Sequence, residues 1–225
     1  MKGKRRFVRR LLRWFWLAAL ASYTVAAAGL FALRWVNPPF TSVHIQRRVE
    51  SWFEKPPYKK RYHFVALGRI SRHLQHAVIT SEDARFFEHR GFDWKEIREA
   101  VEDDLEDGRV RGASTITQQL VKNLFLTTSR SLVRKGVEFA LVPLAEAILS
   151  KRRILELYLN VIEWGPGVYG ADAAAHYHYS VGPERITREQ AARLAAILPS
   201  PRRRKPARMD KSSVRILERM AQAGW

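Results

Sequence analysis

The stretch from Glu82 to Glu138 is the most informative part of the chain. It opens with Glu82-Asp83-x-x-Phe86-x-x-His89-x-Gly91 and continues with Gly112-x-Ser114-Thr115-Ile116-Thr117-Gln118-Gln119. It closes with Lys122-Asn123, Arg130 and Arg134-Lys135-x-x-Glu138. Two carboxylates therefore bracket a segment that is rich in hydroxyl groups, amides and cations.

Acids paired in this way are typical of enzymes that act on sugars. One carboxyl group moves a proton while the other assists at the opposite end of the bond. The four cations are not needed to hydrolyse a sugar, but Arg and Lys neutralise the charge that develops on a departing phosphate or pyrophosphate. The combination indicates glycosyl transfer from a phosphorylated donor rather than cleavage of a glycan.

Glu82 is predicted to lie on a helix, where it shares one face with Val78, Ile79, Arg85 and Phe86. Apolar neighbours raise the pKa of a carboxyl group toward neutral pH, which would make Glu82 a usable base. The alternative is a surface acid paired with Arg85, and the helical pattern alone favours that alternative.

Glu138 follows Arg134 and Lys135 by one helical turn and precedes Leu141 and Val142 by one turn. The cations favour the ionised acid beside groups that could hold a pyrophosphate. The apolar residues place this acid in a cleft rather than on an exposed face. The alternative is an ordinary helix ion pair worth about 0.2–0.5 kcal/mol.

Residues 112–119 predict a flexible entry into a helix, whose free backbone N–H groups attract anions. Taken alone, the same residues indicate an N-cap at Ser114 with a polar surface, and the cations after them indicate a solvated face. Asn123 is expected to orient the following turn. His89 is expected to be a hydrogen-bonded structural residue rather than a proton shuttle.

Further blocks follow downstream: Lys151-Arg152-Arg153-Ile154-Leu155-Glu156-x-Tyr158-Leu159-Asn160, then Gly165, Gly170 and Ala173-Ala174, then Glu189, Ala191, Ala195 and Leu198-Pro199-x-Pro201. Five blocks in this order are highly specific. With them, from about Pro38 to the C-terminus, the chain resembles the monofunctional biosynthetic peptidoglycan transglycosylases. That glycosyltransferase family polymerises lipid II and also forms the first domain of bifunctional penicillin-binding proteins.

The resemblance implies a lysozyme-like, all-α glycosyltransferase domain with a smaller lobe near the membrane. It implies that Glu82 is the general base, which deprotonates the attacking sugar 4-hydroxyl, and that Glu138 is the second essential glutamate. It implies that four residues contact sugar or phosphate oxygens in the groove: Ser114, Thr115, Gln118 and Gln119. The cationic clamp on the pyrophosphate is then Lys122, Arg130, Arg134 and Lys135.

The implied substrates are lipid II and the growing glycan strand, and the products are a β-1,4-linked strand and undecaprenyl pyrophosphate. No cofactor is expected to be required, while a divalent cation (Mg²⁺ or Mn²⁺) near the pyrophosphate stays open, as do cell-division or elongation proteins as partners. The chain departs from the family at His178-Tyr179, where Tyr-Phe is usual, which concerns local packing. Pro143 should kink the helix that carries Glu138.

Residues 14–33 form an uncharged, mostly apolar segment that as a helix would be about 30 Å long, enough to span the hydrocarbon core. Seven cations and no acid precede it: Lys2, Lys4, Arg5, Arg6, Arg9, Arg10 and Arg13. The positive-inside rule then predicts a single-pass inner-membrane protein with a cytoplasmic N-terminus and a periplasmic catalytic domain. The alternative is a signal peptide cleaved near Gly29, but apolar residues continue past that point.

The net charge of +18 requires nucleic-acid binding to be considered. Zinc spacing, a phosphate-binding glycine loop and an aromatic basic strand are all missing from the sequence, so nucleic acid is not an expected partner. A basic surface resting on an anionic membrane is the simpler explanation. The chain has no Cys, which excludes disulfides and thiol chemistry, and no metal site is expected from its histidine spacing.

Four regions are predicted: a basic cytoplasmic tail (1–13), a transmembrane helix (14–36), a juxtamembrane region (37–69) and the glycosyltransferase domain (70–225). Asn37-Pro38-Pro39 should stop the membrane helix, and a short helix is expected over 43–53. N-caps are predicted at Asp93, Ser114, Ser131 and Thr187. Helices are predicted over 71–88, 93–106, 114–124, 131–149, 152–160, 169–178, 187–197 and 213–222, with no strand pattern long enough to demand a sheet.

Two other function classes compete with a lipid II polymerase. A lysozyme-like hydrolase shares an all-α fold and an acidic glutamate, but it needs no Arg and Lys cluster between its acids. An inactive membrane scaffold should have lost Glu82 or Glu138, and both are present.

Overall fold

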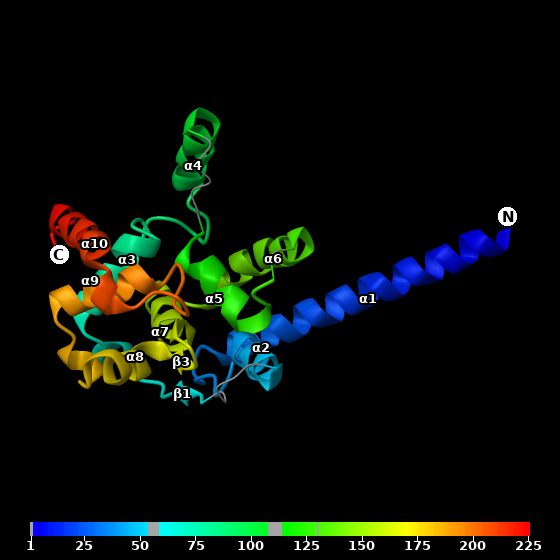
Figure 1. Cartoon of the computed structure of the whole chain (residues 1–225). Helices are drawn as coiled ribbons and strands as arrows, with labels where there is room; N and C mark the ends of the chain where they lie inside the picture. The colour runs from blue at the N-terminus through cyan, green and yellow to red at the C-terminus, as the bar shows by residue number, and fades with distance from the viewer. Residues whose placement is uncertain (1, 54–58, 108–113, 130) are drawn as a thin grey trace.

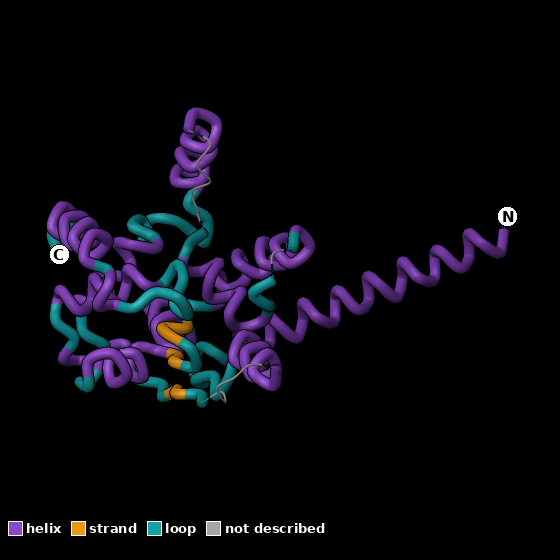
Figure 2. The backbone as a smooth tube through the Cα atoms, viewed as in Figure 1, coloured by secondary structure: helices purple, strands orange, loops and turns teal. Residues whose placement is uncertain are grey.

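A computed structural model describes residues 2–53, 59–107, 114–129 and 131–225. As predicted, the described chain is mainly helical (Figures 1 and 2). Its α-helices are α1 (Lys2–Ala32), α2 (Ser42–Glu50), α3 (Arg72–Glu82), α4 (Trp94–Asp107), α5 (Ile116–Phe125), α6 (Leu132–Ile148), α7 (Lys151–Val161), α8 (Gly170–Tyr179), α9 (Arg188–Ile197) and α10 (Asp210–Gln222). Short 3₁₀ turns are η1 (Ser51–Phe53), η2 (Leu67–Arg69), η3 (Pro183–Arg185) and η4 (Pro206–Arg208).

Helix α1 extends from the body of the molecule as a long rod (Figure 1). It starts at Lys2 rather than at residue 14, because Lys and Arg are good helix formers and the basic tail continues the helix. The segment Arg6–Ala32 is long and apolar enough to cross a membrane. Its last turns pack on the domain, where Leu30 is fully buried and Gly29 faces the ring of Phe125.

The end of α1 is held by a side chain from α7. The Arg153 guanidinium donates to the carbonyl oxygens of Leu33 (2.8 Å) and Val36 (3.0 Å) and to the Asn37 side chain (2.9 Å). These oxygens follow the last helical turn, where the chain has no further helical N–H donors. The end of α1 is thereby joined to α7, which packs against α5.

Helices α5 and α7 pack against each other in the core, with α6 beside α5, while α3 packs against α9 and α10. Fully buried Tyr158 and Trp164 are among the largest side chains of this core. Helix α6 continues through Pro143 to Ile148, so the proline does not end it. His178, where the sequence departs from the family that it resembles, bonds through Nε2 to the carbonyl of Trp164 (2.8 Å), and burial lowers its pKa.

Two predicted N-caps are confirmed and two differ. The Asp93 carboxylate accepts from the backbone N–H of Glu96 (2.9 Å), and Thr187 forms a capping box with Gln190. Ser131 precedes α6 without a side-chain cap bond. The prediction at Ser114 was wrong by one residue, because Thr115 is the N-cap of α5 and is reciprocally bonded to Gln118.

A small sheet lies beside α8, formed by β1 (Arg61–Tyr62), β2 (Glu163–Gly165) and β3 (Val168–Tyr169) (Figure 2). Its order is β1-β3-β2, with β1 parallel and β2 antiparallel to β3. Strands of two or three residues are too short to show an alternating pattern, which is why the sequence did not predict them. Gly170 follows with a φ of +83°, and its backbone lies so near the Asn160 carbonyl that a Cβ would clash.

Candidate active site

Helix α3 ends at Glu82, six residues earlier than predicted. The next residue, Asp83, leaves the helix with φ −167° and ψ 72°. Arg85 is therefore not on a helical face with Glu82; it pairs with Asp93, whose Oδ2 accepts from Nε at 3.0 Å. Phe86 is fully buried in the core. The alternative of a Glu82–Arg85 surface pair is thus wrong, because the turn after α3 carries Arg85 away.

The Glu82 carboxylate is bonded to a neutral amide. Gln119 Nε2 donates to Glu82 Oε2 at 2.8 Å, and the other end of the same amide accepts from the Tyr158 hydroxyl at 2.9 Å. Burial raises the pKa of Glu82, while Gln119 and Lys122 oppose that rise. Burial raises the pKa of Tyr158 well above its usual range, so the hydroxyl keeps its proton and fixes the orientation of the amide.

Asp83 braces the turn that presents Glu82. One carboxylate oxygen accepts from His89 Nε2 at 2.8 Å, and the other accepts from the backbone N–H of Ile116 at 3.0 Å. Because the Gly91 N–H donates to His89 Nδ1 (3.2 Å), the proton of His89 sits on Nε2. The structural role predicted for His89 is confirmed, and the end of α3 is tied to the start of α5.

The four predicted groove residues differ in their surroundings. Thr115 and Gln118 are both 2% exposed, and their side chains bond to each other's backbone N–H groups in the capping box. The Thr115 hydroxyl also donates to the Gly91 carbonyl at 2.7 Å. Ser114 is exposed and lines the pocket in front of Glu82, and Gln119 contacts Glu82 itself. Substrate contact by these four residues stays a prediction.

Glu138 lies on α6 in cationic surroundings. Glu138 is 2% exposed, and both of its carboxylate oxygens are engaged, one by Arg134 Nη1 at 2.5 Å and the other by Lys135 Nζ. Arg134 is anchored a second time, because its Nε donates to the Ser129 carbonyl at 2.7 Å. Asn123 donates to the Gln119 carbonyl at 2.8 Å, within α5.

Lys122 connects the two glutamates electrostatically. Burial lowers the pKa of this ammonium; Glu138 and Glu82 raise it, and Arg134 and Lys135 lower it further. All four of these charges thus act on Lys122. The predicted site residues from α3, α5 and α6 are therefore brought together in space. Arg130, the fourth predicted cation, lies outside the described residues.

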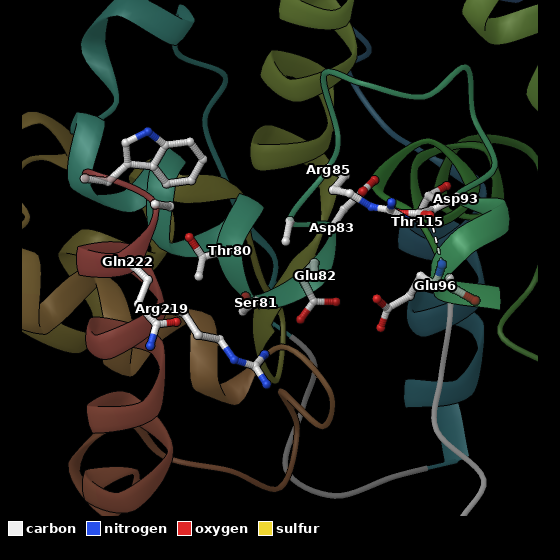
Figure 3. Close-up of a pocket in the computed structure, with 14 residues that line it drawn as sticks. Thr80, Ser81, Glu82, Asp83, Arg85, Asp93, Glu96, Thr115, Arg219 and Gln222 are labelled. Atoms are coloured by element: carbon white, nitrogen blue, oxygen red, sulfur yellow. Dashed lines mark hydrogen bonds and ion pairs between the residues drawn. The ribbon is translucent and has the colours of Figure 1, made fainter. Parts of the chain in front are cut away.

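A pocket of about 660 Å³ opens in front of Glu82, between α3, the start of α5 and the C-terminal helix α10. In Figure 3, Arg219 reaches from α10 toward the Glu82 carboxylate, with Glu96 on the opposite side. Arg204 also lowers the pKa of Glu82 by its charge. Arg204 and Arg219 also line a second, smaller pocket beside Glu82, so the C-terminal part of the chain brings cations to this acid.

Asp83, His89 and Asp93 lie close enough together to share a cation. Their ligand atoms are already engaged: both Asp83 oxygens and both His89 nitrogens have partners, and Asp93 binds Arg85 and the start of α4. A metal would have to break these bonds, so the cluster does not fit a resident divalent cation.

Comparison with known proteins gives the family. The transglycosylase family model matches residues 48–221. The chain belongs to the transglycosylase family. It is similar to the biosynthetic peptidoglycan transglycosylase of Pseudomonas entomophila, with 47% identity over 196 residues, covering 87% of this chain and 80% of the relative. The corresponding proteins of Ectopseudomonas mendocina and Pseudomonas aeruginosa are 42% and 44% identical, covering 98% and 88% of this chain and 91% and 83% of theirs.

Several residues that shape the site of this transglycosylase had no role predicted from the sequence. Tyr158 and Asp83 position Gln119 and the Glu82 turn, and Arg219 faces Glu82 from the C-terminal helix. Tyr158 and Asp83 belong to the motif blocks of the sequence, which marked them as important but did not indicate what they do. Arg219 belonged to no block, because only the packing of α10 against α3 and α9 brings it to the pocket.

Proposed function

We propose that this transglycosylase polymerises lipid II into β-1,4-linked glycan strands and releases undecaprenyl pyrophosphate. The observation that supports this proposal is that the two glutamates have different kinds of partner. Glu82 is paired with a neutral amide, while Glu138 is surrounded by Arg134, Lys135 and Lys122. One end of such a site can accept a proton, and the other can hold a pyrophosphate.

Glu82 acts as the general base on the 4-hydroxyl of the incoming lipid II. As the proton passes to the Glu82 carboxylate, the sugar oxygen forms a bond to the anomeric carbon of the growing strand. The bond from that carbon to the lipid pyrophosphate breaks, and its electron pair leaves with the pyrophosphate. Attack from the opposite face converts the α-linked donor into a β link. The raised pKa of Glu82 supports this role, because it strengthens the carboxylate as a base.

Lys122, Arg134 and Lys135 stabilise the departing pyrophosphate, with Arg130 as the fourth predicted cation. Glu138 orients Arg134 and Lys135, since each cation bonds to one of its carboxylate oxygens. Preorganised cations need little rearrangement as charge develops on the leaving group. Assistance by Mg²⁺ or Mn²⁺ at the pyrophosphate is a separate proposal, which chelation with EDTA tests. Cell-division or elongation proteins likewise stay proposed partners.

A lipid-linked substrate requires the site to lie near a membrane. Exposed apolar side chains follow α1 in the chain and occur again on η1 and at the start of α6: Trp35, Phe40, Trp52, Phe53, Leu132 and Val133. We place α1 across the inner membrane with its basic end in the cytoplasm and the domain in the periplasm. A reporter active only in the periplasm, fused after Trp225, should be active; a silent one would refute this orientation. N-terminal sequencing that starts near Gly29 would instead show a cleaved signal peptide.

One experiment distinguishes the polymerase from a hydrolase. Wild-type protein is given lipid II and purified glycan strands separately, and products are resolved on a gel. Polymer is expected from lipid II, and Arg134→Ala and Lys135→Ala should each slow its formation by roughly 10- to 150-fold, since a charge-assisted contact is worth about 1.5–3 kcal/mol. Fragments released from the strands, with no polymer from lipid II, would overturn the proposal.

A further inference from the structure

Residues 126–129 are the described part of the loop between α5, which carries Lys122, and α6, which carries Arg134. Ser129 in this loop offers the backbone carbonyl that accepts from Arg134 Nε at 2.7 Å. The other side of the same guanidinium binds Glu138. The direction of Arg134 therefore depends on where this loop places the Ser129 carbonyl.

The loop is held by the juxtamembrane helix α2, more than 80 residues earlier in the chain. Gln46 Oε1 accepts from the Thr128 backbone N–H at 2.8 Å, and Gln46 Nε2 donates to the Thr128 hydroxyl at 2.8 Å. Ser42, one turn earlier, donates to the carbonyls of Leu126 (2.5 Å) and Asn123 (3.1 Å). The Gln46 side chain thus makes two hydrogen bonds to Thr128, one to its backbone N–H and one to its hydroxyl group.

Helix α2 is itself fixed to the core, so Gln46 is already in position to bond to Thr128. Thr41 caps its first turn, and Val43 and His44 are 2% and 3% exposed. His44 bonds to the Val161 carbonyl at the end of α7 (3.3 Å) and packs against Tyr169 with ring centroids 4.1 Å apart. Gln46 therefore extends from a helix whose position is set by the core.

We propose that Gln46 is a positioning residue for the leaving-group site, acting through Thr128 and the Ser129 carbonyl on Arg134. The inference rests on the proposed function, because it assigns Arg134 to the departing pyrophosphate. Without the two Gln46 hydrogen bonds, Thr128 and Ser129 can move. Arg134 then keeps its charge but loses its bond to the Ser129 carbonyl, one of the two bonds that orient it. Substrate binding should change little, whereas alignment of the guanidinium in the transition state should suffer.

The first test is Gln46→Leu in the full-length protein, assayed with lipid II. We expect kcat to fall roughly tenfold, the effect of about 1.4 kcal/mol, with KM changed less than twofold. Thr128→Ser keeps both contacts and should stay near the wild-type rate. The matched control is Gln190→Leu, which removes a Gln-to-backbone bond in the capping box of α9, away from the loop, and should leave kcat unchanged. A wild-type kcat in Gln46→Leu would overturn the proposal.

The second test asks whether Gln46 acts through Arg134. In the Arg134→Ala background, Gln46→Leu should cost less than twofold, because the group that it positions is gone. An equal loss in both backgrounds would show an independent, merely structural effect. If Gln46→Leu does not fold, Thr128→Val, which removes the hydroxyl contact alone, replaces it in the same cycle with a smaller expected loss. Failure of wild-type protein to make polymer would refute the proposed function itself, and is visible in the same assay.

Discussion

The two glutamates of the site differ in their surroundings, and Glu82 is partly buried while Glu138 is almost fully buried. Glu82 bonds to the neutral amide of Gln119, and burial raises its pKa. Glu138 is 2% exposed and bonds to two cations, Arg134 and Lys135. The difference shows that burial alone does not set the role of an acid. The neutral amide of Gln119 leaves the Glu82 carboxylate able to accept a proton, as proposed, whereas Glu138 holds two cations in place.

The largest expected effect is on the neutral side of this comparison. Glu82→Gln keeps the shape of the side chain but removes the base, and it should reduce lipid II polymerisation by 10²- to 10⁴-fold. Because the folded-state pKa of Glu82 is raised, its charge costs stability at neutral pH, so the variant should melt at a slightly higher temperature. Thermal melting followed by circular dichroism measures the stability change, and the lipid II assay measures the loss of polymerisation. Near-wild-type turnover would remove Glu82 from the role of base.

The second effect is on the charged side. Glu138→Gln leaves Arg134 and Lys135 without their shared anion, and should slow polymerisation on the order of 100-fold while lowering the melting temperature. The opposite signs of the two stability changes are the sharpest test of the comparison. Glu189→Gln is the matched control, because Glu189 pairs with Arg193 at the same helical spacing but on the surface, and should change neither quantity much. Stabilisation by Glu138→Gln would contradict the account.

A smaller effect is expected on the pH profile. The Gln119 hydrogen bond lowers the pKa of Glu82 against the effect of burial, so Gln119→Leu should raise that pKa further. A base must be deprotonated, and therefore the acid limb of kcat/KM should move to higher pH. Tyr158→Phe, which only frees the amide to rotate, should move it less in the same direction. A limb that shifts toward lower pH in Gln119→Leu would show that the amide does not stabilise the carboxylate.

His44 is a buried group that becomes positively charged, in contrast to the two glutamates. It should affect stability rather than turnover. Burial, helped by the charge of Lys60, lowers the pKa of His44 from 6.5 to about 4, while the bond to the Val161 carbonyl opposes this shift. As the pH is lowered, His44 therefore takes up a proton in the unfolded chain before it does so in the folded protein. The free energy of unfolding should decrease as the pH falls from about 6.5 to about 4, by up to about 3 kcal/mol. The melting temperature measured across this range should fall less steeply in His44→Phe. An identical slope in both proteins would rule out His44 as the cause.

Much of the site was predictable because local patterns carry local chemistry. The i, i+3 and i, i+4 spacing of Arg134, Lys135 and Glu138 predicted their ion pairs, and the motif blocks identified the family. The end of α3 was not predictable in this way. Helical periodicity continues to Arg85 and Phe86, but Asp83 bonds instead to His89 and to the start of α5, which ends the helix at Glu82. A tertiary contact overrode local propensity.

The sequence by itself determined the helical class, the apolar N-terminal helix, the transglycosylase family and the two glutamates with their cations. It did so because periodicity, charge spacing and motif order are properties of short stretches of chain. Only the tertiary structure decided which partner each acid has. Gln119 meets Glu82 across 37 positions, and Gln46 meets Thr128 across 82. Contacts at such separations depend on how helices pack, and no local pattern contains that information.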